Sequence, residues 1–148
     1  MSDLSFRVSG ESTSPAQFVA KARNFQLIVD EPKELGGTDE DANPVEYILA
    51  GLAGCLNVVG HLVAKELGFE IKKLNVEVTG TLNPNKLFGV SDAERAGFKE
   101  INLNLIPETD APIELLVDWL QIVQERCPVK DNLTNSTPVR VSVEKQYA

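Results

Sequence analysis

The sequence predicts an α+β fold, built as one domain over residues 1–148. An apolar run over residues 45–64 has the length of a long helix. Several shorter segments alternate apolar and polar residues, which is typical of strands with one face in water. No internal repeat or Gly/Ser-rich linker divides the chain, and 148 residues is the size of one ordinary domain.

The alternating segments predict antiparallel strands, because strands buried on both faces of a parallel sheet are continuously apolar. The expected strands cover residues 6–8, 18–22, 25–29, 74–78, 101–105 and 139–143. Turn-forming residues at 83–85 and 91–97 lie between two of these strands, so we expect turns there.

The apolar run predicts a central helix with clear signals at both ends. Asn43 can cap the helix, Pro44 suits its first position, Glu46 completes a capping box, and Gly68 suits the end. Apolar residues lie on nearly every side of this helix, so nearly every side must be covered. One sheet from a single chain covers about half of such a helix, and we therefore expect a second copy of the chain to cover the remainder.

The same run is long enough to cross a membrane, which is the alternative to a core helix. Glu46, Asn57 and His61 interrupt it, and no basic segment precedes it, so we expect a buried helix and no membrane partner. The first residues of the chain lack the basic start and apolar run of a secretory signal. We therefore expect a cytoplasmic protein.

A second helix is expected over residues 112–126, with Asp110 as its cap. Its apolar residues keep to one side, Cys127 continues that side, and Pro128 ends the helix. The apolar positions are Ile113, Leu116, Val117, Leu120 and Val123.

Composition excludes several classes of protein. The chain is 43% hydrophobic and 24% charged, as expected of a globular domain with a core. Its 14 basic and 22 acidic residues give a net charge of −8, and no basic cluster is present, so we expect no nucleic-acid partner. With one histidine and two cysteines at no metal-ligand spacing, we expect neither a metal nor another cofactor.

The two cysteines, Cys55 and Cys127, allow two interpretations. Most free cysteines are small buried hydrophobic residues, and 72 positions of separation exclude a Cys-x-x-Cys motif. Alternatively, the helices bring both sulfurs to one apolar pocket, where one attacks an oxidant and the other resolves the product. His61 cannot act as the base for Cys55, because it lies about 120° around the helix and about 9 Å along it. We expect His61 to bond Asn57 instead.

Four segments of the sequence resemble the OsmC/organic hydroperoxide resistance family, and the order of elements agrees over nearly the whole chain. They are Asp30-Glu31-Pro32, Leu35-Gly36-Gly37-Thr38-Asp39, the run from Asn43-Pro44 to Ala53-Gly54-Cys55, and Cys127-Pro128-Val129. The resemblance implies an OsmC-like fold, with antiparallel sheets wrapped around long central helices in an intertwined homodimer. It places two active sites at the subunit interface.

The family's peroxidases reduce organic hydroperoxides with two cysteines. By this resemblance Cys55 is the attacking thiolate, which forms a sulfenate, and Cys127 is the resolving thiol of a Cys55–Cys127 disulfide. The family also points to regeneration by an external dithiol of the lipoyl type. The rival functions are a non-catalytic protein of the same fold that binds a small hydrophobic ligand, and a redox sensor.

The chemistry also needs a cation, because a free thiol has a pKa near 8.5 and is mostly protonated at neutral pH. An arginine held by a carboxylate meets this need. Arg23 is our candidate cation, Arg7 is the alternative, and Glu46 is the candidate orienting acid.

The chain departs from the family pattern at two positions. The family's acid directly follows Asn-Pro, where this chain has Val45, and Glu46 stands one residue later. Glu46 is about half a turn out of phase with Cys55, so the alternative roles are to cap its own helix or to serve the site of the partner subunit. Lys130 stands where a small hydroxyl residue is common, and it is either solvated or a source of positive charge.

Overall fold

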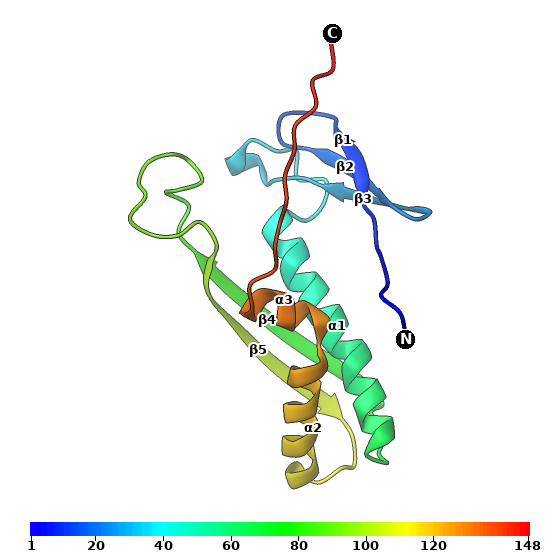
Figure 1. Cartoon of the computed structure of the whole chain (residues 1–148). Coiled ribbons are helices and arrows are strands. Elements are labelled where there is room, and N and C mark those ends of the chain that lie inside the picture. Colours follow the sequence, from blue (N-terminus) through cyan, green and yellow to red (C-terminus); the bar gives the residue numbers. More distant parts are fainter. The chain divides into compact units, whose positions relative to one another are not determined.

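The computed structural model describes residues 1–148, which divide into two compact units, Met1–Ala50 and Gly51–Ala148 (Figure 1). The expectation of a single domain stays a prediction. The elements in order are β1 (Ser9–Ser12), β2 (Phe18–Ala22), β3 (Phe25–Val29), the 3-10 helix η1 (Lys33–Leu35), α1 (Pro44–Glu66), β4 (Lys73–Leu82), β5 (Phe98–Glu108), α2 (Ile113–Arg126) and α3 (Pro128–Thr134).

The first unit contains an antiparallel sheet in the order β1-β2-β3. The strands predicted at residues 18–22 and 25–29 are confirmed. The strand predicted at residues 6–8 is wrong, because pairing with β2 begins only at Ser9, opposite Lys21. Phe6 and Val8 are exposed.

The loop after β3 is organised by one buried carboxylate, that of Asp30. It accepts hydrogen bonds from the hydroxyl and the N–H of Thr38 and from the N–H groups of Glu31 and Glu40, and it is also bonded by the amide of Gln17. The Thr38 hydroxyl and these other donors hold the pKa of Asp30 well below its usual range.

The capping box predicted for the central helix is present at the start of α1. The N–H of Glu46 donates to Asn43 Oδ1, and the N–H of Asn43 donates to Glu46 Oε1, each at 2.9 Å. After the helix ends, Gly68 has a φ of 83°, which glycine adopts without strain. By length and composition alone, α1 is the one helix in the structure that could cross a membrane.

In the second unit, α1 lies against β4, β5 and α2, and its buried side forms most of the core. The core residues are Leu52, Leu56, Val59, Val63, Ala64, Ile71, Trp119, Val123 and Cys127. The prediction of a core helix is therefore confirmed for this part of α1. Its other side is uncovered in the single chain, with Val58 66% and Leu62 47% exposed.

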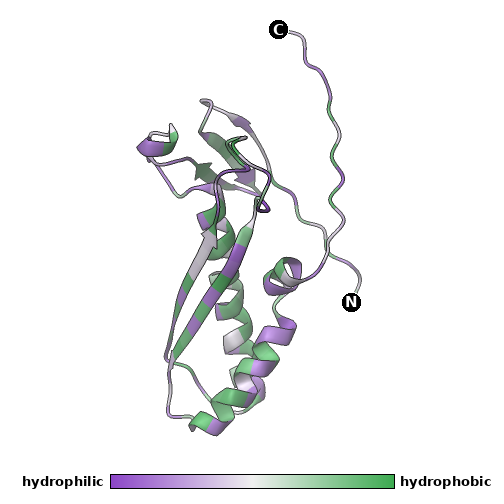
Figure 2. Ribbon diagram, turned by 90° about the vertical axis from the view of Figure 1, so that its left-hand side faces the viewer, coloured by the Kyte–Doolittle hydropathy of each residue, from purple (hydrophilic) through white to green (hydrophobic).

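The strands predicted at 74–78 and 101–105 form the antiparallel pair β4–β5, which extends beyond both predictions. Val76 pairs with Leu105 and Val78 with Leu103. Figure 2 shows hydrophobic and hydrophilic residues alternating along both strands, as the sequence predicts. Five side chains of this pair pack against the core, namely Leu74, Val78, Ile101, Leu103 and Leu105.

The helix predicted at residues 112–126 is α2, with Trp119 and Val123 buried. The prediction of Asp110 as its cap is wrong. Pro112 occupies the N-cap position in an extended conformation, and its carbonyl accepts from the N–H groups of Leu115 and Leu116. The short helix α3, which follows at once, was not expected from the sequence.

The strand predicted at residues 139–143 is wrong. A strand needs a neighbouring strand to accept its hydrogen bonds, and neither sheet includes this segment. Its valines are almost fully exposed, with Val139 at 81%, Val141 at 89% and Val143 at 97%.

Candidate active site

The structure brings the two cysteines together. Cys55 comes from the middle of α1 and Cys127 from the junction of α2 and α3. Both are free thiols, and the S–H of Cys127 points to the Sγ of Cys55 at 3.0 Å. A disulfide requires about 2.05 Å. A movement of about 1 Å would therefore let the two sulfurs bond.

Packing between α1 and α2 explains this proximity. The indole of Trp119 is buried, and its Nε1–H donates to the carbonyl oxygen of Gly60 at 2.7 Å. The lack of a side chain on Gly60 admits the ring, since a Cβ there would lie 3.1 Å from Trp119. Cys127 is completely buried in the same cluster, whereas Cys55 is only half-buried.

The junction between α2 and α3 fixes the second sulfur. Cys127 ends α2 and is also the N-cap of α3, where its Sγ accepts the N–H of Lys130 at 3.4 Å. Pro128 takes the first position of α3, which suits its fixed φ and missing N–H. This Cys-Pro pair is the sequence signal that could have revealed α3.

Burial raises the pKa of the Cys55 thiol. A hydrogen bond from the N–H of Val129 partly opposes this rise, whereas the neighbouring Cys127 raises the pKa further. No charged side chain is among the groups that shift it. Within the single chain, Cys55 is thus held as the thiol.

The predicted cations lie in the other unit of the chain. Arg23 occupies the turn between β2 and β3, with a φ of 56°, and its guanidinium lies over the ring of Phe25 at 4.9 Å from the centroid. Arg7 precedes β1 and is exposed. A role for either residue beside Cys55 stays a prediction.

The carboxylate of Glu46 is engaged in the capping box with Asn43, which is the first of the alternative roles given above. Its role as orienting acid stays a prediction. Lys130 contributes its main-chain N–H at Cys127, and its ammonium makes no ion pair.

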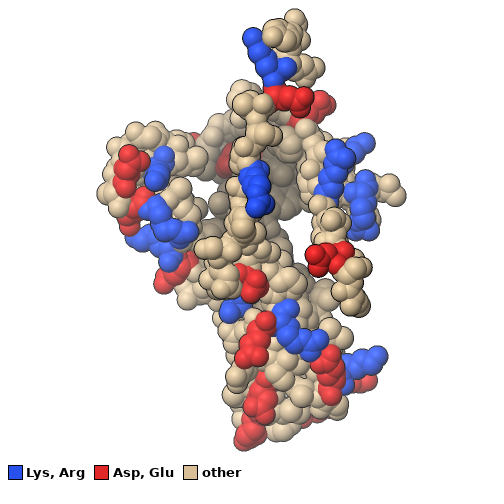
Figure 3. Space-filling view, in the orientation of Figure 1, with Lys and Arg blue, Asp and Glu red and all other residues tan.

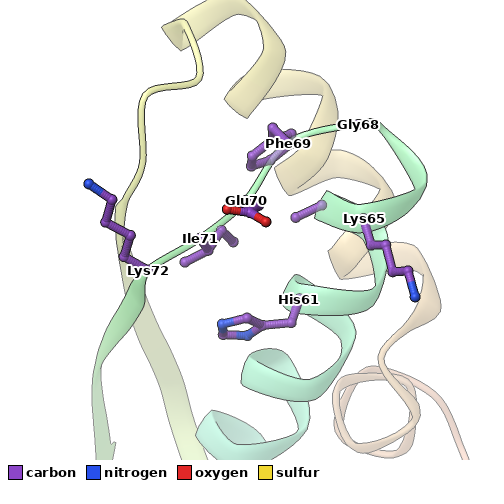
Figure 4. Close-up of a pocket in the computed structure, with 8 residues that line it drawn as sticks. His61, Lys65, Gly68, Phe69, Glu70, Ile71 and Lys72 are labelled. Atoms are coloured by element: carbon purple, nitrogen blue, oxygen red, sulfur yellow. The ribbon is translucent and has the colours of Figure 1, made fainter.

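His61 bonds Asn57 as expected, with Nδ1 2.9 Å from the main-chain carbonyl oxygen. It lines a pocket between the last turns of α1 and the segment that follows them, together with Lys65, Phe69, Glu70 and Lys72 (Figure 4). Neither cysteine lines this pocket.

A groove of about 490 Å³ between β5 and α2 was not foreseen from the sequence. Its walls are mostly apolar and include Leu103, Leu105, Leu116 and Trp119. Leu56, which directly follows Cys55 in the chain, also lines it.

On the face shown in Figure 3, acidic and basic side chains are intermixed.

The fold and the paired thiols define a class: an α+β protein in which a helix-borne cysteine meets a second cysteine from a helix junction. The family model for OsmC-like protein matches residues 37–142, and the chain belongs to this family. The predicted family and OsmC-like fold are thereby confirmed.

Comparisons with individual proteins agree with this family assignment. The chain is 26% identical over 145 residues to a hydroperoxide reductase of Mycoplasma pneumoniae, covering 95% of each protein. It resembles the crystal structure of an OsmC like protein from Mycoplasma pneumoniae with a TM-score of 0.79 and 25% identity, over 90% of this chain and 89% of the other. An organic hydroperoxide resistance protein OsmC from Legionella pneumophila shares the fold, with a TM-score of 0.64, 16% identity and coverage of 90% and 91%.

Proposed function

We propose that this protein is a thiol-dependent peroxidase that reduces organic hydroperoxides. The observation that carries the proposal is the 3.0 Å separation of the Cys55 and Cys127 sulfurs, which lie 72 residues apart in sequence. The name of its Mycoplasma pneumoniae relative, a hydroperoxide reductase, supports the same chemistry.

The reaction begins at Cys55, the less buried of the two sulfurs. Its thiolate attacks the terminal oxygen of the hydroperoxide, so that an S–O bond forms and the O–O bond breaks. The alkoxide takes a proton and leaves as the alcohol, and Cys55, oxidised by two electrons, becomes a sulfenic acid.

Cys127 then resolves the sulfenic acid. Its sulfur attacks the sulfur of Cys55, the S–S bond forms, and the hydroxide leaves as water with the proton that Cys127 gives up. An external dithiol, of the lipoyl type by family resemblance, returns two electrons by thiol–disulfide exchange.

Thiolate formation needs a cation, because burial raises the pKa of Cys55 in the single chain. In this proposal Arg23 supplies the cation, with Arg7 as the alternative, and Glu46 orients the guanidinium. The proposed homodimer covers the exposed face of α1 around Val58 and Leu62, and it is the assembly in which a partner's residues can complete the site.

The second candidate function is binding of a small hydrophobic ligand. The apolar groove between β5 and α2 is the observation that favours it. A redox sensor, which is oxidised without efficient turnover, is a variant of the first proposal.

A peroxide-consumption assay tests the proposal. The wild-type protein, Cys55→Ser and Cys127→Ser are each given cumene hydroperoxide or tert-butyl hydroperoxide with dihydrolipoamide as the dithiol. We expect turnover by the wild type, none by Cys55→Ser, and a single turnover by Cys127→Ser that leaves Cys55 as a sulfenic acid reactive toward dimedone. Consumption of neither peroxide by the wild type would favour the ligand-binding alternative.

A further inference from the structure

The two sulfurs of the candidate site have unequal environments, and this inequality bears on how the oxidised protein is reduced. Cys55 is half-buried, whereas Cys127 is completely buried. Cys127 also has a main-chain donor held in place by α3, the N–H of Lys130 at 3.4 Å from its Sγ.

We propose that the external reductant attacks the sulfur of Cys55 in the Cys55–Cys127 disulfide, and that Cys127 leaves as a thiolate that accepts the N–H of Lys130. This inference rests on the proposed dithiol chemistry, and it assigns the sulfur that forms the mixed disulfide. It also gives the main chain of Lys130 a role in the reduction step.

Access supports the attack on Cys55. Thiol–disulfide exchange requires an incoming thiolate to reach one sulfur along the S–S axis, opposite the leaving sulfur. Cys127 lies among Trp119, Val123 and Leu56 in the core cluster, with no exposed surface. An incoming thiolate would have to displace core side chains to reach it, whereas Cys55 is already in partial contact with solvent.

The leaving group supports the same direction. Exchange is faster when the leaving thiolate is stabilised. The N–H of Lys130 has the position to hydrogen-bond this charge, and Pro128 at the start of α3 fixes the intervening backbone. A hydrogen bond to a charged acceptor is stronger than one to a neutral thiol, so this bond strengthens as the S–S bond breaks.

The electrons and protons balance in two exchanges. In the first, one thiolate of the dithiol bonds to Cys55, the Cys55–Cys127 bond breaks, and Cys127 departs with the electron pair and then takes a proton. In the second, the remaining thiol of the reductant attacks the reductant sulfur that is bonded to Cys55. Cys55 is released as a thiolate, and the reductant, having lost two electrons, closes to a cyclic disulfide.

The site of attack can be measured directly on the wild-type protein. The disulfide is first formed with diamide, so that the result does not depend on peroxidase activity. The oxidised protein is treated with the monothiol cysteamine, quenched with acid, alkylated and mapped by peptide mass spectrometry. We expect the cysteamine adduct on Cys55 and the alkyl group on Cys127, and a majority of adducts on Cys127 would overturn the proposal.

The role of the Lys130 N–H can be tested without changing any side chain. Because Cys127 is a natural ligation site, residues 127–148 can be joined as a synthetic peptide to residues 1–126, with an ester in place of the amide at Lys130. The ligated protein with the normal amide is the matched control. We expect the ester to slow reduction of the diamide-formed disulfide about three- to tenfold, the usual effect of losing one hydrogen bond.

The same pair of proteins separates this effect from a general loss of structure. Alkylation of Cys55 by iodoacetamide in the reduced protein does not involve Cys127 as a leaving group. We therefore expect its rate to change less than twofold between ester and amide. Equal rates of disulfide reduction, or equal slowing of both reactions, would overturn the role of the Lys130 N–H.

Discussion

The indole N–H of Trp119 donates to the main-chain carbonyl of Gly60 across the α1–α2 interface, at 2.7 Å. The two residues are 59 positions apart in sequence. The bond is buried and joins the helix that carries Cys55 to the helix that ends at Cys127. It therefore helps to define the distance between the two sulfurs.

Replacing Trp119 with phenylalanine is expected to destabilise the protein by about 1–3 kcal/mol, because the buried donor is lost and the smaller ring leaves space. Urea unfolding measures this. Val117→Ala, on the exposed side of the same helix, should change the stability by less than about 0.5 kcal/mol. Similar values for the two variants would contradict this account of the interface.

Because of Asp30, the free energy of unfolding should decrease in acid. Its pKa is lowered in the folded state from an ordinary value of 3.8, so its contribution is fully present above that value and is lost as the pH falls below it. Thermal unfolding between pH 2 and pH 6 should show this decline. Asp30→Asn should lower the stability near pH 6 and flatten the decline, whereas Asp3→Asn, an exposed carboxylate outside the hydrogen-bond network, should not.

The uncovered face of α1 predicts how the proposed homodimer can be broken. Val58→Glu would place a charge at an apolar position that is 66% exposed in the single chain. If a second chain covers that position, burial of the unpaired carboxylate should shift the protein to monomer in analytical ultracentrifugation. Gln121→Glu, an exposed position on α2, is the control. An unchanged molecular mass for Val58→Glu would place the dimer contact elsewhere.

The cation proposed to act on Cys55 can be identified from the pH dependence of Cys55 alkylation. Burial raises the pKa of this thiol, and a guanidinium beside it would act in the opposite direction. Arg23→Gln is therefore expected to move the alkylation midpoint to higher pH, and Arg95→Gln, in the β4–β5 loop, should leave it unchanged. A shift with Arg7→Gln alone would assign the role to Arg7.

Helices and strands that are determined by neighbouring residues could be predicted from the sequence. The capping box of Asn43 and Glu46 gave the start of α1, and the period-two alternation gave β4 and β5. The strand expected at residues 139–143 has the same alternation, but no strand in either sheet pairs with it. Periodicity records which residues can face a core, not whether a neighbouring strand exists.

The candidate site was predictable in part for the same reason. Cys55 and Cys127 could be named from motifs, while their 3.0 Å separation depends on Trp119 packing against Gly60, a contact without a local signal. The network around Asp30 was also missed. An acidic segment resembles a solvated loop in sequence. Only the fold shows that the Asp30 carboxylate is buried and accepts hydrogen bonds from residues such as Thr38 and Glu40.

Cys127 closes one helix and opens the next, so the connection between α2 and α3 has no spare residue. Adding a single amino acid before Pro128 would separate Cys127 from the first turn of α3, so the Lys130 amide would no longer lie opposite its sulfur. This stretch of the chain should accept changes of side chain far more readily than changes of length. Homologues with a longer or shorter connector would need another way to seat their second thiol.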